Sequence, residues 1–193
     1  MMQDNLRVHG SIFYLLKKFV LSMYPERVWK EFLNNAGKDA DFEFIITESY
    51  PIEDIEQLVH AASNHTGLSV HTLQEKFGEW LVPDLFQVYS SYLNPGWKTF
   101  EVLVNTEEVF HGAVRKLNST ARPPVLHVSE VRDDFLIIDY YSKRKMSSLA
   151  IGIIKGIARY YNEHDKIQIA PTTEPDAERV QIRVTFIDRK VRL

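Results

Sequence analysis

Three side chains that donate hydrogen bonds stand at alternate positions in the segment YYSKR: Tyr140, Ser142 and Arg144. Alternate residues of a strand share one face, and on this face they continue the apolar positions Leu136 and Ile138. A guanidinium can bind a carboxylate through two parallel hydrogen bonds. Each hydrogen bond to an ionised group contributes about 1.5–3 kcal/mol. The pattern therefore predicts a site for an apolar ligand with an acidic edge.

The same three residues also have a purely structural interpretation. Tyr140 could be a core aromatic residue, Ser142 a turn residue and Arg144 a surface charge at the start of a helix. Position in the sequence does not by itself decide between a binding site and these ordinary roles.

His111 lies in the segment EEVFHGAVRKL, whose apolar periodicity predicts a helix. Val104, Glu107, Val114 and Arg115 fall near the same side of that helix as His111, and the bordering positions are apolar. An imidazole on a largely apolar side is either a hydrogen-bonded structural residue or a metal ligand. The spacing leaves both roles open.

Gly112 follows His111 directly, inside the same expected helix. Glycine in a helix costs roughly 1 kcal/mol relative to alanine, and it often marks the close approach of another group, either a flat ligand or a second helix. The paired-histidine metal motifs HExxH and HxxEH do not occur in the sequence. A metal site built from several histidines is therefore not predicted.

With 193 residues, of which 45% are hydrophobic and 12% aromatic, the chain can bury one substantial core, and its length favours a single domain. The formal charge of -3 gives no basic excess, so neither nucleic acid nor a membrane is expected as a partner. Cysteine is absent, which excludes disulfides, thiolate zinc sites, iron–sulfur clusters and a cysteine nucleophile. Any cofactor must then be held non-covalently by other side chains.

The first long apolar stretch, SIFYLLKKFVLSMY, is interrupted by Lys17 and Lys18. These charges make it neither a membrane-spanning helix nor a convincing signal peptide, so a cytoplasmic protein is expected. Residues 1–8 are polar and without a pattern, and they are expected to form a loosely held extension.

Periodicity divides the chain into a helical part at about 9–120 and a mixed part at about 121–190, within one domain over 9–193. Helices are expected at 11–23, at 26–37, within 49–67, at 69–89 with Ser69 as N-cap and a break at Pro83, and at 98–119. The later elements are expected as strands at 125–131 and 134–142, a helix at 145–161, and strands at 166–171 and 179–187. Helices followed by this ββαββ order indicate the α+β class with an antiparallel sheet.

His111, the segment ARPP, the YxSxR pattern and the following KMSSLAIGIIKG occur in that order along the chain. In this combination the sequence resembles the heme nitric oxide/oxygen binding (H-NOX) domain family, which is related to the heme domain of soluble guanylate cyclase. The resemblance covers nearly the whole chain, from HGSIF to RVTFI, and it includes FGEW in the helical part.

The resemblance implies a heme b between the helical half and the ββαββ half, with His111 as the axial iron ligand. Tyr140, Ser142 and Arg144 would hold the two heme propionates, whose charges would be costly to bury without partners. Pro124 would press against the porphyrin and bend it, so that relief of the bend becomes a mechanical signal.

The family positions that face the gas correspond to Leu16, Leu81 and Leu149, with Trp80 as a competitor for the place of Leu81. Oxygen-binding members have a tyrosine at the position of Leu149, whose hydroxyl donates a hydrogen bond to the oxygen. Losing such a donor forfeits ~1.5–3 kcal/mol, roughly 10- to 150-fold in affinity. Nitric oxide does not need this donor. A pocket selective for nitric oxide is therefore expected, with carbon monoxide as a second candidate gas.

The resemblance thus implies a stand-alone sensor that is not an enzyme. Nitric oxide would weaken the bond between iron and His111, release the helix that carries His111 and let the heme flatten against Pro124. The signal would pass in trans to a separate effector protein, such as a histidine kinase or a cyclic-di-GMP enzyme.

Two other functions stay open at this point. A heme peroxidase-like enzyme would use Arg144 or a distal histidine as acid or base, although no histidine stands at a family-matched distal position. A heme-free interaction module would instead use the YxSxR cluster to bind an acidic lipid or peptide.

Overall fold

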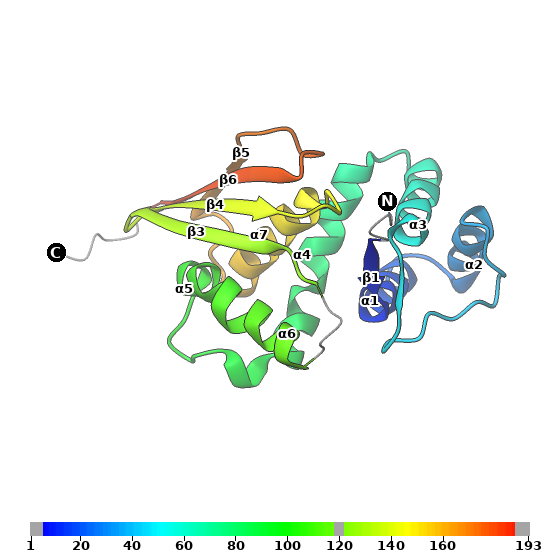
Figure 1. Cartoon of the computed structure of the whole chain (residues 1–193). Coiled ribbons are helices and arrows are strands. Elements are labelled where there is room, and N and C mark those ends of the chain that lie inside the picture. Colours follow the sequence, from blue (N-terminus) through cyan, green and yellow to red (C-terminus); the bar gives the residue numbers. More distant parts are fainter. Residues whose placement is uncertain (1–5, 118–121, 188–193) are drawn as a thin grey trace, which may run out of the picture. The chain divides into compact units, whose positions relative to one another are not determined.

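Helices fill the first part of the chain and a four-stranded antiparallel sheet dominates the last part, which confirms the α+β class (Figure 1). The structure is a computed structural model that describes residues 6–117 and 122–187. The chain forms two compact units, Met1–Phe77 and Gly78–Leu193. No helix within the described ranges combines the length and the apolar character needed to cross a membrane.

The described residues of the first unit that precede α4 (Val70–Val88) form three helices and a short pair of strands. Its elements are β1 (Arg7–His9), α1 (Gly10–Leu21), α2 (Glu26–Asn35), β2 (Ser49–Pro51) and α3 (Ile52–Thr66). Apolar spacing predicts all three helices, and α3 ends at Gly67, whose φ of 71° is the left-handed conformation that glycine adopts at helix ends.

The pairing of β1 with β2 is a feature that the sequence did not predict. The two strands run antiparallel, with Val8 opposite Tyr50, and Val8 is only 5% exposed. The loosely held stretch expected at residues 1–8 is therefore shorter, since Arg7 and Val8 belong to a paired strand. Residues 1–5 lie outside the described residues.

Helix α4 (Val70–Val88) runs from the first unit into the second. The hydroxyl of Ser69 accepts a hydrogen bond from the backbone N–H of Thr72 at 3.1 Å, so the expected N-cap is confirmed. The expected break at Pro83 is wrong, because the helix continues to Val88. A proline removes one helical hydrogen bond and leaves the carbonyl one turn earlier, here that of Glu79, without its usual partner.

The helix expected at 98–119 is divided by a π-helical turn. Helix α5 (Thr99–Asn105) continues into the π-helical segment η2 (Thr106–His111) and then into α6 (Gly112–Leu117), and a short 3-10 turn, η1 (Ser90–Tyr92), precedes them. The side chains of Asn105 and Thr106 each donate to a backbone carbonyl four residues earlier, both at 2.7 Å. These bonds compete with the regular backbone ladder at the start of η2.

The sheet of the second unit has the strand order β3-β4-β6-β5, and all neighbours are antiparallel. Its strands are β3 (Val125–Arg132), β4 (Phe135–Tyr141), β5 (Ile167–Pro171) and β6 (Arg179–Phe186), and helix α7 (Ser147–Tyr160) follows β4 in the chain. The expected ββαββ order is thus confirmed. Leu136, Ile138 and Tyr140 of β4 lie on the buried face, as their period-two spacing predicts.

The core of the second unit joins this sheet face to α5, η2 and α7. Leu103, Phe110, Ile138 and Ile154 belong to one cluster of buried side chains. The boundary between the units falls after Phe77, so α5 and α6 belong to the same unit as the sheet. The change from helices to strands lies between Leu117 and Val125, near residue 120 as the sequence predicted.

Candidate functional site

A mainly aliphatic cavity of about 90 Å³ lies beside His111 in the second unit. Its walls come from α5, η2, the residues before β3, the strands β3, β4 and β6, and helix α7. Besides His111, the polar side chains that the described residues bring to this wall are those of Thr106 and Tyr140. Pockets for small molecules and cofactors are usually roughly 300–1,000 Å³, so a large planar ligand would have to widen this cavity.

His111 is the only histidine among the described residues that line the cavity, and its side chain is 16% exposed. Its Nδ1 lies 2.8 Å from Oε2 of Glu107. Burial lowers the pKa of His111, and this effect outweighs the opposing influence of Glu107 and a weaker one from the backbone of Pro124. The imidazole is therefore neutral at neutral pH, which is the form that binds metal.

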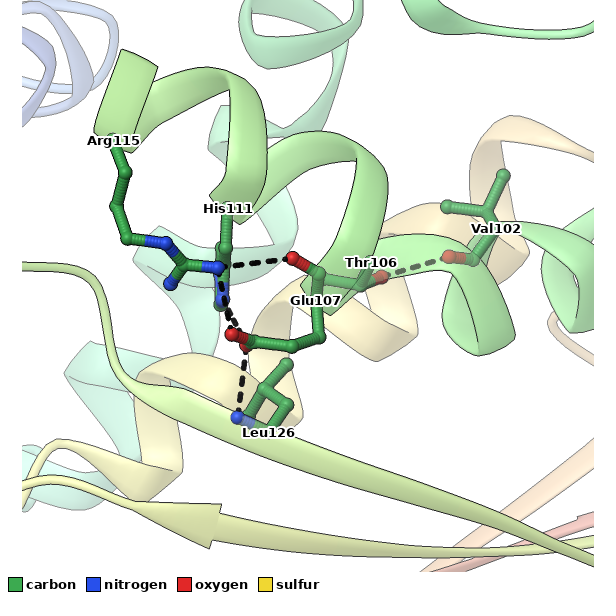
Figure 2. A network of polar contacts seen from close by, with 6 residues as sticks. All are labelled: Val102, Thr106, Glu107, His111, Arg115 and Leu126. Carbon is green, nitrogen blue, oxygen red and sulfur yellow. Dashed lines mark hydrogen bonds and ion pairs between the residues drawn. The ribbon is translucent and has the colours of Figure 1, made fainter.

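Glu107 accepts three hydrogen bonds with its carboxylate, and Figure 2 shows them together. Besides His111, the donors are the guanidinium of Arg115 at 2.9 Å and the backbone N–H of Leu126 in β3 at 3.0 Å. Burial raises the pKa of Glu107, but these donors outweigh it and leave the pKa below its usual value. The carboxylate is therefore ionised.

Sequence reasoning placed Glu107 and Arg115 on the side of His111 but assigned neither a role. The spacing of four residues between Glu107 and His111 was an available signal, because such pairs meet on a helix. The hydrogen bond from the backbone N–H of Leu126 to Glu107 could not be predicted from the sequence, because the two residues are 19 positions apart.

Tyr140, Ser142 and Arg144 do lie together, although the expected strand geometry is only partly correct. Strand β4 ends at Tyr141, so Ser142 and Arg144 lie in the turn after it and not on the strand face. The phenol of Tyr140 is hydrogen-bonded to the side chain of Ser142, and the backbone N–H of Arg144 donates to the same hydroxyl at 3.2 Å. The turn brings the phenol of Tyr140 and the backbone of Arg144 to the side chain of Ser142.

Burial shifts the pKa of two of these residues, Tyr140 and Arg144. It raises the pKa of Tyr140, which is 3% exposed, and it lowers the pKa of Arg144. The guanidinium of Arg144 donates to the backbone carbonyl of Arg122, just before Pro123 and Pro124. Because a guanidinium carries five N–H donors, Arg144 can hold this carbonyl and an acidic group at the same time.

Pro124 lines the cavity together with His111. The three leucines expected around the gas are placed differently. Leu81 is buried in α4 and Leu149 is partly buried in α7, and neither belongs to the lining of this cavity. Leu16 is buried in α1 of the first unit. The distal role of these leucines therefore stays a prediction.

Helix α7 lines the cavity with Ala150, Ile153, Ile154 and Ile157, which sequence reasoning did not select. Their spacing of three and four residues is the available signal, because it marks one face of a helix. Within the described ranges, no group of three or more His, Cys, Asp or Glu side chains could hold a metal ion. A metal at His111 would therefore need most of its ligands from another molecule.

Comparison with known proteins decides the family. Residues 9–169 match the family model for haem-NO-binding proteins. The chain belongs to the H-NOX family. H-NOX domains bind heme and are gas-sensor domains, and the match includes His111, Pro124 and the cluster of Tyr140, Ser142 and Arg144.

Solved H-NOX structures share this fold. An H-NOX protein from S. oneidensis in the Fe(II)NO ligation state has a TM-score of 0.85 at 20% identity, covering 94% of this chain and 100% of that chain. The Fe(II) unliganded H-NOX protein from K. algicida has a TM-score of 0.84 at 19% identity, covering 94% and 98%. A point mutant of the T. tengcongensis H-NOX has a TM-score of 0.81 at 22% identity, covering 93% and 97%.

The donor set around the cavity fits heme. A neutral imidazole suits iron, the aliphatic wall suits a porphyrin face, and a guanidinium with two hydroxyls suits propionates.

Proposed function

We propose that this H-NOX domain senses nitric oxide through a heme b whose iron is bound by His111. The observation that carries the proposal is the orientation of His111: a neutral imidazole on the wall of an aliphatic cavity, held at Nδ1 by Glu107. This hydrogen bond leaves Nε2 as the nitrogen for iron. When bound, heme iron supplies the coordination position for the gas.

At the heme edge, the cluster of Tyr140, Ser142 and Arg144 would bind the propionates. Arg144 would supply the charge and the two hydroxyls would supply single hydrogen bonds. Existing hydrogen bonds support this role: the phenol of Tyr140 is bonded to the side chain of Ser142, and the guanidinium of Arg144 is held by the carbonyl of Arg122. Pro124 would contact the porphyrin on the side of His111 and bend it, which its place in the cavity wall supports.

Selectivity for nitric oxide over oxygen rests on the absence of a donor from α7. The α7 side chains that line the cavity are aliphatic, and Leu149 takes the family position of the tyrosine in oxygen-binding members. Without that donor, oxygen loses ~1.5–3 kcal/mol, roughly 10- to 150-fold in affinity. Leu16 and Leu81 would complete an apolar distal wall, and carbon monoxide is a second candidate ligand.

The signal would start when nitric oxide weakens the bond between iron and His111. The segment η2 and helix α6 would then shift against β3, and relief of the contact with Pro124 would let the porphyrin flatten. The changed surface would act in trans on a separate effector protein, such as a histidine kinase or a cyclic-di-GMP enzyme.

The test is the absorption spectrum of the ferrous protein under nitrogen, air and nitric oxide, with heme supplied. We expect a Soret band that shifts with nitric oxide and not with air, and loss of the histidine-ligated spectrum in His111→Ala. His127→Ala is the matched control, because His127 lies outside the cavity wall and packs on Tyr141.

Each alternative outcome has a separate meaning. A stable oxygen complex in air would refute the selectivity and leave the heme site standing. Peroxide turnover far above that of free heme would favour an enzyme. No Soret band after heme is supplied would refute the sensor and leave a heme-free interaction module.

A further inference from the structure

We infer that Glu107 is a positioning residue for His111, which selects the ring nitrogen offered to iron and couples the imidazole to strand β3. The inference rests on the proposed function, because it assigns the support of the axial ligand. The carboxylate lies one helical turn before His111 and bonds to it at 2.8 Å. It would act on the iron only through the imidazole.

The contacts of Glu107 join three separate parts of the second unit. Oε2 faces both Nδ1 of His111 in η2 and the backbone N–H of Leu126 in β3, at 2.8 and 3.0 Å. Oε1 accepts from Arg115 in α6 at 2.9 Å. In Figure 2 the Glu107 side chain extends from its helix toward β3, with His111 and Arg115 beside it. One carboxylate thus connects the helix that carries His111 to the sheet.

The ring nitrogen that is protonated follows from this geometry. A carboxylate that receives an N–H from Leu126 and a guanidinium acts as an acceptor, so Nδ1 of His111 must be the protonated nitrogen. The imidazole also interacts with the backbone carbonyl of Pro124. In the neutral ring with the proton on Nδ1, the lone pair is on Nε2, which is the nitrogen that would bind iron. A carboxylate on the far side of a metal-bound imidazole also raises its basicity, and so strengthens the bond to the metal.

The local backbone supports this function of the pair. Glu107 and His111 both lie inside the π-helical segment η2, and single π-helical turns within α-helices occur frequently at functional sites. The hydroxyl of Thr106, directly before Glu107, is held by the carbonyl of Val102 at 2.7 Å. The start of the segment is therefore anchored, and the Glu107 side chain is directed toward β3.

The coupling has a consequence for signalling. If His111 were released from iron, its hydrogen bond to Glu107, and that of Glu107 to the N–H of Leu126, would still join the imidazole to β3. Movement of the imidazole would therefore pull on β3 as well as on α6. Glu107 thus gives His111 a direct connection to the sheet in addition to the helix itself.

The first experiment uses the apo protein, so it does not depend on heme. Histidine labelled with nitrogen-15 reports the protonated ring nitrogen of His111 by NMR. We expect Nδ1–H in the wild type and a mixture of both tautomers in Glu107→Gln. Glu108→Gln, which changes an exposed neighbour, should keep the wild-type tautomer. An Nε2–H tautomer in the wild type would overturn the inference.

The second experiment uses the heme-loaded protein. Resonance Raman should show a lower iron–histidine stretching frequency in Glu107→Gln, and the reduction potential of the iron should rise. Supporting partners of metal-bound histidines typically contribute 10–100-fold to metal affinity or activity, so release of His111 by nitric oxide should become more complete. Equal frequencies and potentials in the Glu107→Gln and Glu108→Gln variants would mean that Glu107 only anchors β3.

Two controls keep the result interpretable. If Glu107→Gln does not fold, Glu107→Asp keeps the charge but shortens the reach, and the same shifts are expected in smaller measure. Binding of heme through His111 with no effect of either variant would refute this inference alone. Failure of the wild type to bind heme would refute the proposed function, while the apo NMR result would still test the tautomer.

Discussion

Replacing Gly156 by alanine should destabilise the second unit, because α4 and α7 meet at this residue with no room for a side chain. An added Cβ would lie 2.6 Å from the carbonyl oxygen of Glu79 and 2.6 Å from a methyl group of Val82. The carbonyl is backbone, so a side-chain rotation cannot relieve the contact. It is also the carbonyl that Pro83 leaves without its helical partner, and the close approach of α7 covers it.

The magnitude follows from two opposing effects. Alanine in place of glycine favours a helix by roughly 1 kcal/mol. Overpacking a filled contact costs typically about 1–3 kcal/mol, and contacts with a fixed backbone belong at the upper end. The net loss for Gly156→Ala should therefore be about 2 kcal/mol.

The assay is urea denaturation of the apo protein, with Gly112→Ala as the matched control. Gly112 has helical backbone angles, and its added Cβ would meet nothing closer than the Glu107 carbonyl oxygen at 3.9 Å. Gly112→Ala should therefore gain up to roughly 1 kcal/mol, opposite in sign to Gly156→Ala. An equal gain in both variants would refute the packing argument.

The same substitution should also affect the cavity. Relief of the contact at Gly156 moves α7, whose residues Ala150, Ile153 and Ile157 line the cavity. Heme retention should therefore fall in Gly156→Ala relative to the wild type, as measured by transfer of heme to a competing acceptor.

Two further predictions concern buried ionisable groups. Burial raises the pKa of Tyr89, Tyr140 and Tyr161. Their contribution to the stability of the fold is therefore complete below the usual tyrosine pKa of about 10, and it is lost as the pH rises through the pKa values of the folded state. An absorbance titration should show these phenols ionising above their usual pKa, together with unfolding, and a single transition near pH 10 in the folded protein would contradict this. Lys38 pairs with the buried Asp54 at 2.8 Å, so Lys38→Met should lower the free energy of unfolding by about 3 kcal/mol in urea denaturation, because it leaves a buried charge unpaired. Adding Asp54→Leu to the same chain should recover most of that loss. An unchanged denaturation midpoint for Lys38→Met would show that the ion pair adds nothing to stability.

Short-range spacing in the sequence determined most of the helices, the ββαββ order and the buried face of Leu136, Ile138 and Tyr140. It also placed His111 on a helix side next to Glu107 and Arg115. These features follow from the repeats of 3.6 and 2 residues, which depend only on neighbours along the chain. The signature from His111 to Arg144 is also read from the sequence, but as a resemblance to a family and not from these repeats.

Tertiary structure decided the features that depend on partners far away in the chain. Strand β1 pairs with β2, where Val8 lies opposite Tyr50, and so Val8 could not be placed from its own polar surroundings. Helix α4 continues through Pro83 where the chain packs α7 against the carbonyl that the proline leaves unpaired. A local pattern contains no information on where a distant helix packs.

The same distinction holds at the candidate site. The sequence proposed His111, Tyr140, Ser142 and Arg144 as site residues, and its structural alternative placed Ser142 in a turn. It did not reveal the π-helical segment that carries the histidine. The bond from Leu126 to Glu107 exists only because β3 passes the helix. A hydrogen bond across 19 residues is decided by where the elements pack, and that depends on the whole core, which no local repeat encodes.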